Sequence, residues 1–306
     1  MIKIFTLVVT LLCLSLTAYS KEKHPYVFIL GTAQDAGYPQ AGCYKSHCLP
    51  GWADKDKRRT AISIAYVDQT QKSYIFDASP DFPEHMYRLH QQPFSPSLSG
   101  IFITHAHIGH YTGLMYLGHE AMGALKMPVF VMPKMKQYIE TNGPWSQLVE
   151  KRNITLFELS NEKTYRLSKT LAVTPLLVPH RDEYSETVGF HIQGPRKSAL
   201  FIPDINKWHL WRKDIREEIK KVDYALIDAT FFSGDELPGR DMSKIPHPSV
   251  KESMTLFQSL SNKDKNRIWF IHMNHTNPLL NAESSESKQV IKAGYNIARE
   301  GIKLPM

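Results

Sequence analysis

Three histidines, His105, His107 and His110, lie within six residues of one another, directly after the apolar residues 100–104. The chain has 14 histidines among 306 residues, so such a cluster is not expected by chance. Neutral imidazole is a common ligand of zinc, and an irregular turn between a strand and a helix can bring three rings together. The segment therefore predicts a metal site.

The strand followed by H-x-H-x-x-H resembles the signature of the metallo-β-lactamase superfamily, whose usual form is H-x-H-x-D-H. Gly109 stands where the superfamily has the Asp. The resemblance implies that His105 and His107 bind a metal at site one and that His110 binds one at site two. Because glycine offers no ligand atom, the resemblance also implies a weakened second site.

Further ligands are implied at the ends of later strands. His180 matches the third ligand of site one, Asp204 the carboxylate that bridges the two metals, and His272 the last ligand of site two. Asp204 also suits a helix cap, and one residue can do both. Asp77 matches the superfamily's early Asp, which orients a ligating imidazole from outside the ligand set; a turn or cap residue is the alternative.

The implied site-one set of three imidazoles and one carboxylate suits tetrahedral zinc, or leaves a position open for water. The same nitrogen and oxygen ligands accept iron or manganese, and ligand type alone does not choose among these metals. We therefore expect one or two zinc ions, with iron and manganese as alternatives.

Three further segments resemble one branch of the superfamily, the pyrroloquinoline quinone biosynthesis protein B (PqqB) family. They are residues 30–43, residues 228–242 and the closing F-I-H-M-N-H-T-N-P of residues 270–278, and the likeness runs from about Tyr26 to Leu280. That family typically lacks the two leading histidines of the metal signature and works in the cytoplasm. The resemblance thus implies a shared fold and branch, not a shared reaction.

Cys43 and Cys48 are close enough in sequence to form a disulfide in an oxidising compartment. The C-x4-C spacing also fits half of a structural zinc site, for which His47 lies between them and no fourth ligand is obvious. Disulfide, zinc site and free thiols remain open.

These residues must be positioned by alternating apolar runs and amphipathic stretches. Short runs rich in β-branched and aromatic residues predict strands at 26–30, 61–66, 73–76, 100–104, 128–132, 171–178, 189–193, 199–202, 224–227 and 267–271. Helices are predicted at 80–91, 113–126, 133–142, 207–222, 248–260 and 284–299. Without a linker or repeat between them, these elements indicate one α/β domain with layered sheets. The resemblance implies a four-layer αββα metallo-β-lactamase sandwich as that single domain, spanning residues 21–306.

Residues 1–20 have the parts of an export signal: Lys3, an apolar run at residues 4–16, and small residues at Ala18 and Ser20. The apolar run is shorter than the ~20 residues of a membrane-spanning helix. We expect cleavage after Ser20, a periplasmic or secreted protein and no stable membrane anchor. The net charge of +7 is spread thinly, so we expect a small-molecule substrate and no nucleic acid.

The first hypothesis for function is a metal-dependent hydrolase in which Asp204 orients a metal-activated water against a phosphodiester or lactone. His275 either protonates the leaving group or acts as a site-two ligand, and His247 is a candidate substrate contact in a loop. The alternatives are an iron-dependent oxygenase, which the PqqB resemblance suggests, and a non-catalytic periplasmic binding protein. Oligomeric state is not predicted.

Overall fold

Two seven-stranded sheets form the centre of the computed structural model, which describes residues 24–306 except 238, 240 and 242–244. The predicted signal segment, residues 1–20, lies outside the described residues. In spatial order, the first sheet consists of β14 (Lys303–Pro305), β1 (Tyr26–Gly31), β2 (Ser63–Val67), β3 (Lys72–Phe76), β4 (Ser97–Phe102), β5 (Met127–Val131) and β6 (Ile154–Glu158). The second consists of β13 (Asn296–Ile297), β12 (Ile268–Ile271), β11 (Tyr224–Asp228), β10 (Ser198–Ile202), β9 (Val188–Gln193), β8 (Ala172–Leu177) and β7 (Tyr165–Arg166).

Each sheet has a parallel half and an antiparallel half. Strands β3 to β6 run parallel, as do β10 to β13, while the remaining neighbours pair antiparallel. The carboxyl ends of parallel strands meet at one edge of a sheet, where ligand sites of α/β folds commonly form. Residues that directly follow β3, β4, β10, β11 and β12 are therefore brought towards common edges.

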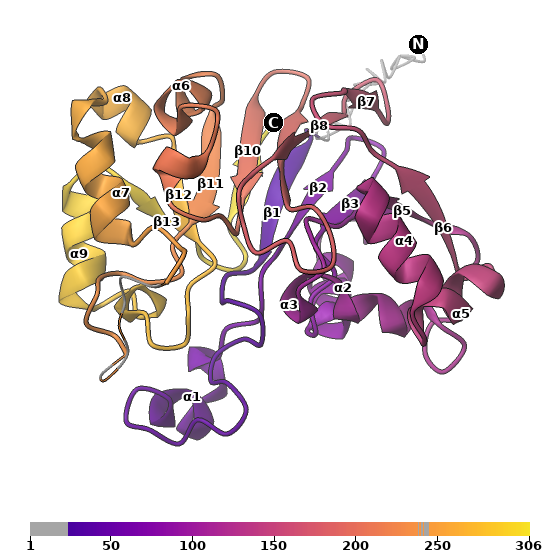
Figure 1. The fold of residues 1–306 in the computed structure, drawn as a ribbon, viewed down its shortest axis with the longest axis horizontal. Coiled ribbons are helices and arrows are strands. Elements are labelled where there is room, and N and C mark those ends of the chain that lie inside the picture. Colours follow the sequence, from indigo (N-terminus) through magenta and orange to yellow (C-terminus); the bar gives the residue numbers. More distant parts are fainter. Residues whose placement is uncertain (1–23, 238, 240, 242–244) are drawn as a thin grey trace, which may run out of the picture.

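Helices cover the outer face of each sheet, so that the molecule has the four αββα layers that the resemblance implies (Figure 1). On one side lie α2 (Phe82–His90), α3 (Ile108–Tyr111), α4 (Pro133–Thr141) and α5 (Trp145–Glu150). On the other lie α6 (Ile215–Lys220), α7 (Val250–Leu256), α8 (Asn262–Lys265) and α9 (Ser285–Lys292). The short α1 (Leu49–Ala53) belongs to a loop that projects from the sandwich (Figure 1). The 3-10 turns in the described part of the chain are η1 (Lys55–Lys57), η2 (Thr112–Leu117), η3 (Trp208–Leu210), η5 (Phe257–Ser259) and η6 (Pro278–Leu280).

Three apolar cores separate the four layers. The core between the sheets is rich in phenylalanine: Phe76 stacks on Phe102 with ring centroids 4.9 Å apart, and Phe190 and Phe201 pack against Phe76 from the opposite sheet. Separate clusters lie between each sheet and its helices. Burial of these side chains on both faces of the sheets holds the strand ends in fixed relative positions, which a multi-residue site requires.

All ten predicted strands are present. The helix predicted at 113–126 is wrong beyond Leu117, where η2 ends next to Gly118. The helix predicted at 207–222 is divided, because Asp214 starts a new helix by accepting a hydrogen bond from the Arg216 amide. The helix predicted to reach residue 299 ends at Lys292, since Gly294 adopts a φ of +91° and the chain then enters β13. No helix among the described residues is long and apolar enough to cross a membrane.

Candidate metal centre

The histidine turn begins where β4 ends and is fixed by Asp77, the residue after β3. One Asp77 oxygen accepts a hydrogen bond from the Thr104 amide at 2.8 Å, and the other accepts one from the Thr104 hydroxyl at 3.0 Å. The chain then turns into α3, with His107 at its N-cap position. Asp77 itself has a φ of +67°, a conformation that non-glycine residues adopt rarely. The strained strand end thus places a buried carboxylate under the histidine turn.

Four predicted ligands, His105, His107, His180 and Asp204, form what we name the first group. Their ligand atoms lie within 4.8 Å of one another. Nδ1 of His107 is 2.8 Å from Nε2 of His105 and 3.3 Å from Nε2 of His180. Asp204 Oδ2 lies 3.4 Å from Nε2 of His105 and 3.2 Å from Nε2 of His180. Ligands about 2.0–2.2 Å from a tetrahedral ion are about 3.4 Å apart, so these side chains fit a metal.

A second group consists of Asp35, His110 and His272, whose ligand atoms also lie within 4.8 Å of one another. Both imidazoles are fully buried. Nε2 of His110, Nε2 of His272 and Oδ1 of Asp35 have no hydrogen-bond partner among the described residues. A buried polar atom without a partner costs about 1–3 kcal/mol. A cation placed among these three atoms would satisfy all of them.

In both groups, the other ring nitrogen of each fully buried imidazole is held by the protein. Nδ1 of His110 lies 2.7 Å from Asp77 Oδ2. Protein groups that hold the outer nitrogen fix the orientation of a ligating ring. The remaining contacts of this kind join His105 Nδ1 to Thr104 Oγ1 at 2.9 Å, His180 Nδ1 to Asn206 Oδ1 at 3.2 Å and His272 Nδ1 to Thr230 Oγ1 at 3.0 Å. The exposed side of His107 differs, because its Nε2 contacts Glu183 at 3.0 Å.

The charges of the centre are arranged for a cation. Burial would raise the pKa of Asp204, but the neighbouring His180 and His247 hold it well below its usual range. Burial lowers the pKa of His105 strongly. In His110 burial is outweighed by the charge of Asp77, which raises the pKa to about 10. The ionised Asp204 beside the neutral His105 is the protonation state that metal binding requires, whereas His110 must release a proton when a metal binds.

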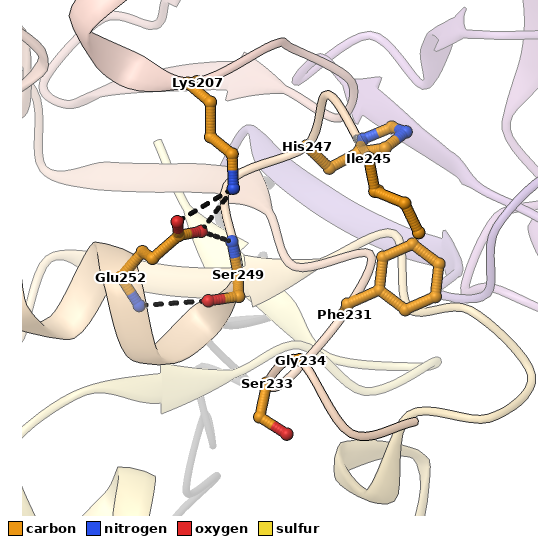
Figure 2. Close-up of a pocket in the computed structure, with 8 residues that line it drawn as sticks. All are labelled: Lys207, Phe231, Ser233, Gly234, Ile245, His247, Ser249 and Glu252. Carbon is orange, nitrogen blue, oxygen red and sulfur yellow. Dashed lines mark hydrogen bonds and ion pairs between the residues drawn. The ribbon is translucent and has the colours of Figure 1, made fainter. Parts of the chain in front are cut away.

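The predicted substrate contact His247 is buried beside the first group. Its Nδ1 lies 2.9 Å from Asp228 Oδ2 and 3.1 Å from Asp204 Oδ1. Although burial opposes it, the charge of Asp228 raises the pKa of His247 to about 9. His247 lines a cavity of about 390 Å³ together with Phe231 and Ile245. Figure 2 shows Lys207 and Glu252, paired at 2.7 Å, on the opposite side of this cavity.

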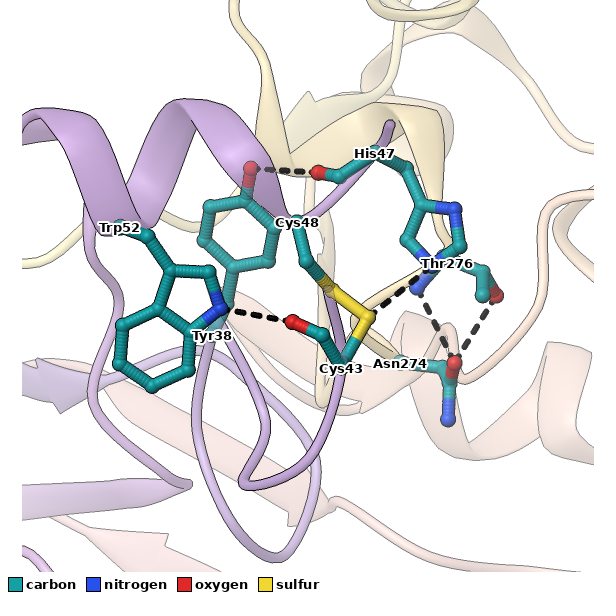
Figure 3. The surroundings of a disulfide bond; sticks show 7 residues. All are labelled: Tyr38, Cys43, His47, Cys48, Trp52, Asn274 and Thr276. Atoms are coloured by element: carbon teal, nitrogen blue, oxygen red, sulfur yellow. Dashed lines mark hydrogen bonds between the residues drawn. A yellow bond between two sulfur atoms is a disulfide. The ribbon is translucent and has the colours of Figure 1, made fainter. Parts of the chain in front are cut away.

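The projecting loop carries Cys43 and Cys48, which form a disulfide (Figure 3). His47 Nε2 lies 3.5 Å from Cys43 Sγ, and the ring of His275 lies 5.5 Å from that of His47. His275, for which sequence gave a catalytic or site-two role, is thus placed beside this pair and in neither histidine group. Of the three alternatives for the cysteines, the structure shows the disulfide, which leaves no thiolate for a zinc site even though His275 lies near them.

The structure brings together eight of the predicted residues and adds three that sequence reasoning missed. Those brought together are His105, His107, His110, His180, Asp204, His272 and, beside them, Asp77 and His247. Those missed as site residues are Asp35, Asp228 and Glu183. Asp35 and Asp228 both fall in segments that the sequence marked only as family resemblance. Asp228 is the last residue of β11 and lies at the same edge as Asp204, and this position at a strand end was the signal available for it.

Comparison with known proteins shows the family to which the chain belongs. Residues 72–273 match the family model described as the β-lactamase superfamily domain. The chain is 25% identical over 303 residues to coenzyme PQQ synthesis protein B of Methylorubrum extorquens (strain PA1), covering 92% of this chain and 100% of that one. It is 24% identical over 307 residues to the same-named protein of Xanthomonas campestris pv. campestris (strain B100), covering 92% and 99%.

Solved structures show the same fold. Zn²⁺-bound PqqB from Methylobacterium extorquens superposes with a TM-score of 0.78 at 22% identity, covering 92% of this chain and 100% of that one. A diphosphatase from the PhnP family superposes with a TM-score of 0.64 at 20% identity, covering 92% and 97%. At these identities the likeness establishes the fold. Together with the family model, it shows that the chain belongs to the β-lactamase superfamily and has the metallo-β-lactamase fold.

Proposed function

We propose that the chain is a metal-dependent hydrolase of a small phosphodiester or diphosphate. The observation that carries the proposal is the convergence of His105, His107, His180 and Asp204, whose ligand atoms lie within 4.8 Å of one another and include four contacts of 2.8–3.4 Å. A bound divalent cation supplies an acidified water and polarises a substrate oxygen. Three imidazoles and one carboxylate suit tetrahedral zinc, and PqqB, which has the same fold, is known in a Zn²⁺-bound form.

The residues around the first group supply the remaining chemistry. Asp204 is ionised, and its Oδ1 has no hydrogen-bond partner among the described residues, so it can accept a hydrogen bond from the attacking water. His247 has a raised pKa and therefore carries a proton at neutral pH. Because Asp228 holds its Nδ1 and the ring lines the cavity, we assign His247 as the acid that protonates the leaving oxygen. The role predicted for His275 thus passes to His247.

A phosphoester is favoured over a lactone by the cationic His247 ring beside the cavity. A cationic ring attracts an anionic phosphoester, whereas a lactone is neutral and gains nothing from this charge when it binds. A diphosphatase is also among the proteins with this fold. Turnover of a lactone alone would favour a lactonase, and metal binding without turnover of any substrate would favour a non-catalytic binding role.

The test is elemental analysis of protein purified without chelators, followed by assays on bis(p-nitrophenyl) phosphate, a nucleoside diphosphate ester and a lactone. We expect bound zinc, phosphodiester turnover that a chelator abolishes and zinc restores, and loss of turnover in His107→Ala. The exposed His119 provides the matched control His119→Ala, which should behave like the wild type. Iron with oxygen uptake, or turnover that survives complete removal of metal, would contradict the proposal.

We also propose export with removal of residues 1–20. The signal-like sequence and the Cys43–Cys48 disulfide support it, since disulfides persist in oxidising compartments. Cell fractionation and N-terminal sequencing test this: we expect a periplasmic or secreted chain beginning at Lys21. An intact chain in the cytoplasm would contradict it.

A further inference from the structure

Gly109 leaves a space in the metal motif, and Asp35 occupies that space. A Cβ atom on Gly109 would lie 2.3 Å from Asp35 Cα and 2.4 Å from Asp35 Oδ1. Real Cβ atoms do not approach other atoms so closely, so no side chain at position 109 is compatible with the observed path of Asp35. The position of Asp35 therefore requires a glycine at position 109, where the motif would otherwise carry its carboxylate.

The loop after β1 is anchored so that Asp35 lies beside the ligand-bearing end of β12. Met273 donates its amide hydrogen to Thr32 O at 2.9 Å, and Gln34 donates its own to Met273 O at 2.8 Å. The Asn274 side-chain amide donates to Gln34 Oε1 at 2.6 Å. These bonds tie the loop to the residues that directly follow His272. Asp35 itself is held at a φ of +34°, which fixes the direction of its side chain.

The carboxylate of Asp35 is directed at the two imidazoles of the second group. Its Oδ1 lies 3.4 Å from Nε2 of His110 and, although buried, forms no hydrogen bond with a described residue. Nε2 of His272 is fully buried and equally without a partner. Asp204 Oδ2, which belongs to the first group and lies 3.4 Å from Nε2 of His105, is also 3.8 Å from Nε2 of His110. Three unsatisfied ligand atoms thus surround one point next to a carboxylate shared with the other group.

We propose that Asp35 supplies the carboxylate that Gly109 lacks, and that Asp35, His110 and His272 form a second metal position next to the first. This inference rests on the proposed metal-dependent function, and it replaces the expectation of a weakened second site. The carboxylate ligand comes from the loop after β1 instead of from the histidine motif. It has the same charge, and the same position beside the metal, as the Asp of the usual motif.

The test is a calorimetric titration of the metal-free full-length mature chain with Zn²⁺, comparing the wild type with Asp35→Asn. Asparagine keeps the size of the side chain and tolerates the left-handed backbone, but it removes the charge. We expect about two ions per chain in the wild type and about one in Asp35→Asn. Loss of groups that only orient ligands weakens metal binding about 10–100-fold, so loss of a direct ligand should weaken the second event at least about 100-fold.

Two further variants complete the experiment. Asp56→Asn removes an exposed carboxylate from the same N-terminal region and should bind as the wild type does. Asp35→Glu restores the charge and should regain the second event in part. Two unchanged events in Asp35→Asn, or one event in both wild type and variant, would overturn this inference and leave the hydrolase proposal standing. Loss of both events in Asp35→Asn would make Asp35 a structural residue and overturn it too. A wild type that binds no zinc would overturn both proposals.

Discussion

The two halves of the metal centre are built in different ways. The first group takes its ligands from chain segments directly after β4, β8 and β10, and its atoms already contact one another. The second group joins α3, the end of β12 and the loop after β1, and it leaves three buried ligand atoms without hydrogen bonds. The difference teaches that the fold determines where a ligand must lie, but not which segment supplies it. A loop distant in sequence can supply the ligand when the local motif does not.

The largest effect should come from Asp204→Asn, because Asp204 contacts ligands of both groups. Loss of its charge leaves the surrounding imidazoles without their shared counter-ion. We expect both zinc-binding events to weaken and turnover to fall at least about 1,000-fold, since both the ion and the water-orienting group are affected. Zinc titration and phosphodiester turnover measure this. A variant that lost only one binding event would show that Asp204 belongs to one group alone.

Gly109→Ala should separate the two halves. The added methyl group meets the backbone of Asp35 at 2.3 Å, so the loop after β1 must move away. We expect loss of the second zinc-binding event with the first retained, and a destabilisation of about 1–3 kcal/mol from overpacking. Zinc titration and thermal unfolding measure both quantities.

The matched control for that variant is Gly143→Ala, because a Cβ at Gly143 meets no atom within 4 Å. It should leave zinc binding unchanged. Equal zinc binding by Gly109→Ala and the wild type would contradict the claim that Asp35 binds the second metal only because position 109 has no side chain.

A smaller effect should follow from changes to the residues that orient the rings. Asp77 holds His110 of the second group, whereas Asn206 holds His180 of the first. We expect Asp77→Asn to weaken mainly the second zinc-binding event, and Asn206→Ala mainly the first, each about 10–100-fold. Competition with a zinc-binding dye measures the two affinities. If both variants weakened the same event, the division into two groups would be wrong.

The smallest effect concerns His85, a fully buried imidazole of α2 outside the centre. Burial, aided by the charge of Arg88, lowers its pKa to about 3, whereas His110 of the centre has a raised pKa because Asp77 is present. The unfolded chain binds a proton at His85 below pH 6.5 and the folded chain does not, so stability is full above pH 6.5 and falls towards pH 3.

We expect this to lower the free energy of unfolding by about 1.4 kcal/mol between pH 7.5 and 5.5. Urea denaturation of the zinc-loaded protein at both values measures it. His85→Leu should remove that part of the pH dependence. An identical pH dependence in variant and wild type would show that His85 is not held neutral.

Sequence was sufficient for the residues whose position follows from a strand end. Asp77, His105, Asp204 and His272 each follow an apolar run by one to three residues, and each lies in the centre. The strands that were not predicted, β6, β7, β13 and β14, lie at the ends of the sheets, where few apolar contacts select a strand-like sequence.

Asp35 could not be assigned in this way. It lies 74 positions before Gly109 in sequence, as the two residue numbers show. Its role depends on the loop that packs beside α3, and a single sequence does not give that contact. The same reason separates His275 from its predicted role: only the path of the projecting loop places it beside His47.

The most direct test of the central claim is anomalous diffraction at the zinc edge from crystals of the mature chain grown with zinc. The account predicts one peak bound by His105, His107, His180 and Asp204, and a second peak between Asp35, His110 and His272, at ligand distances of about 2.0–2.2 Å. Absence of a peak among the first four residues would contradict the metal centre itself, and a second peak without Asp35 as a ligand would contradict the substitution for Gly109.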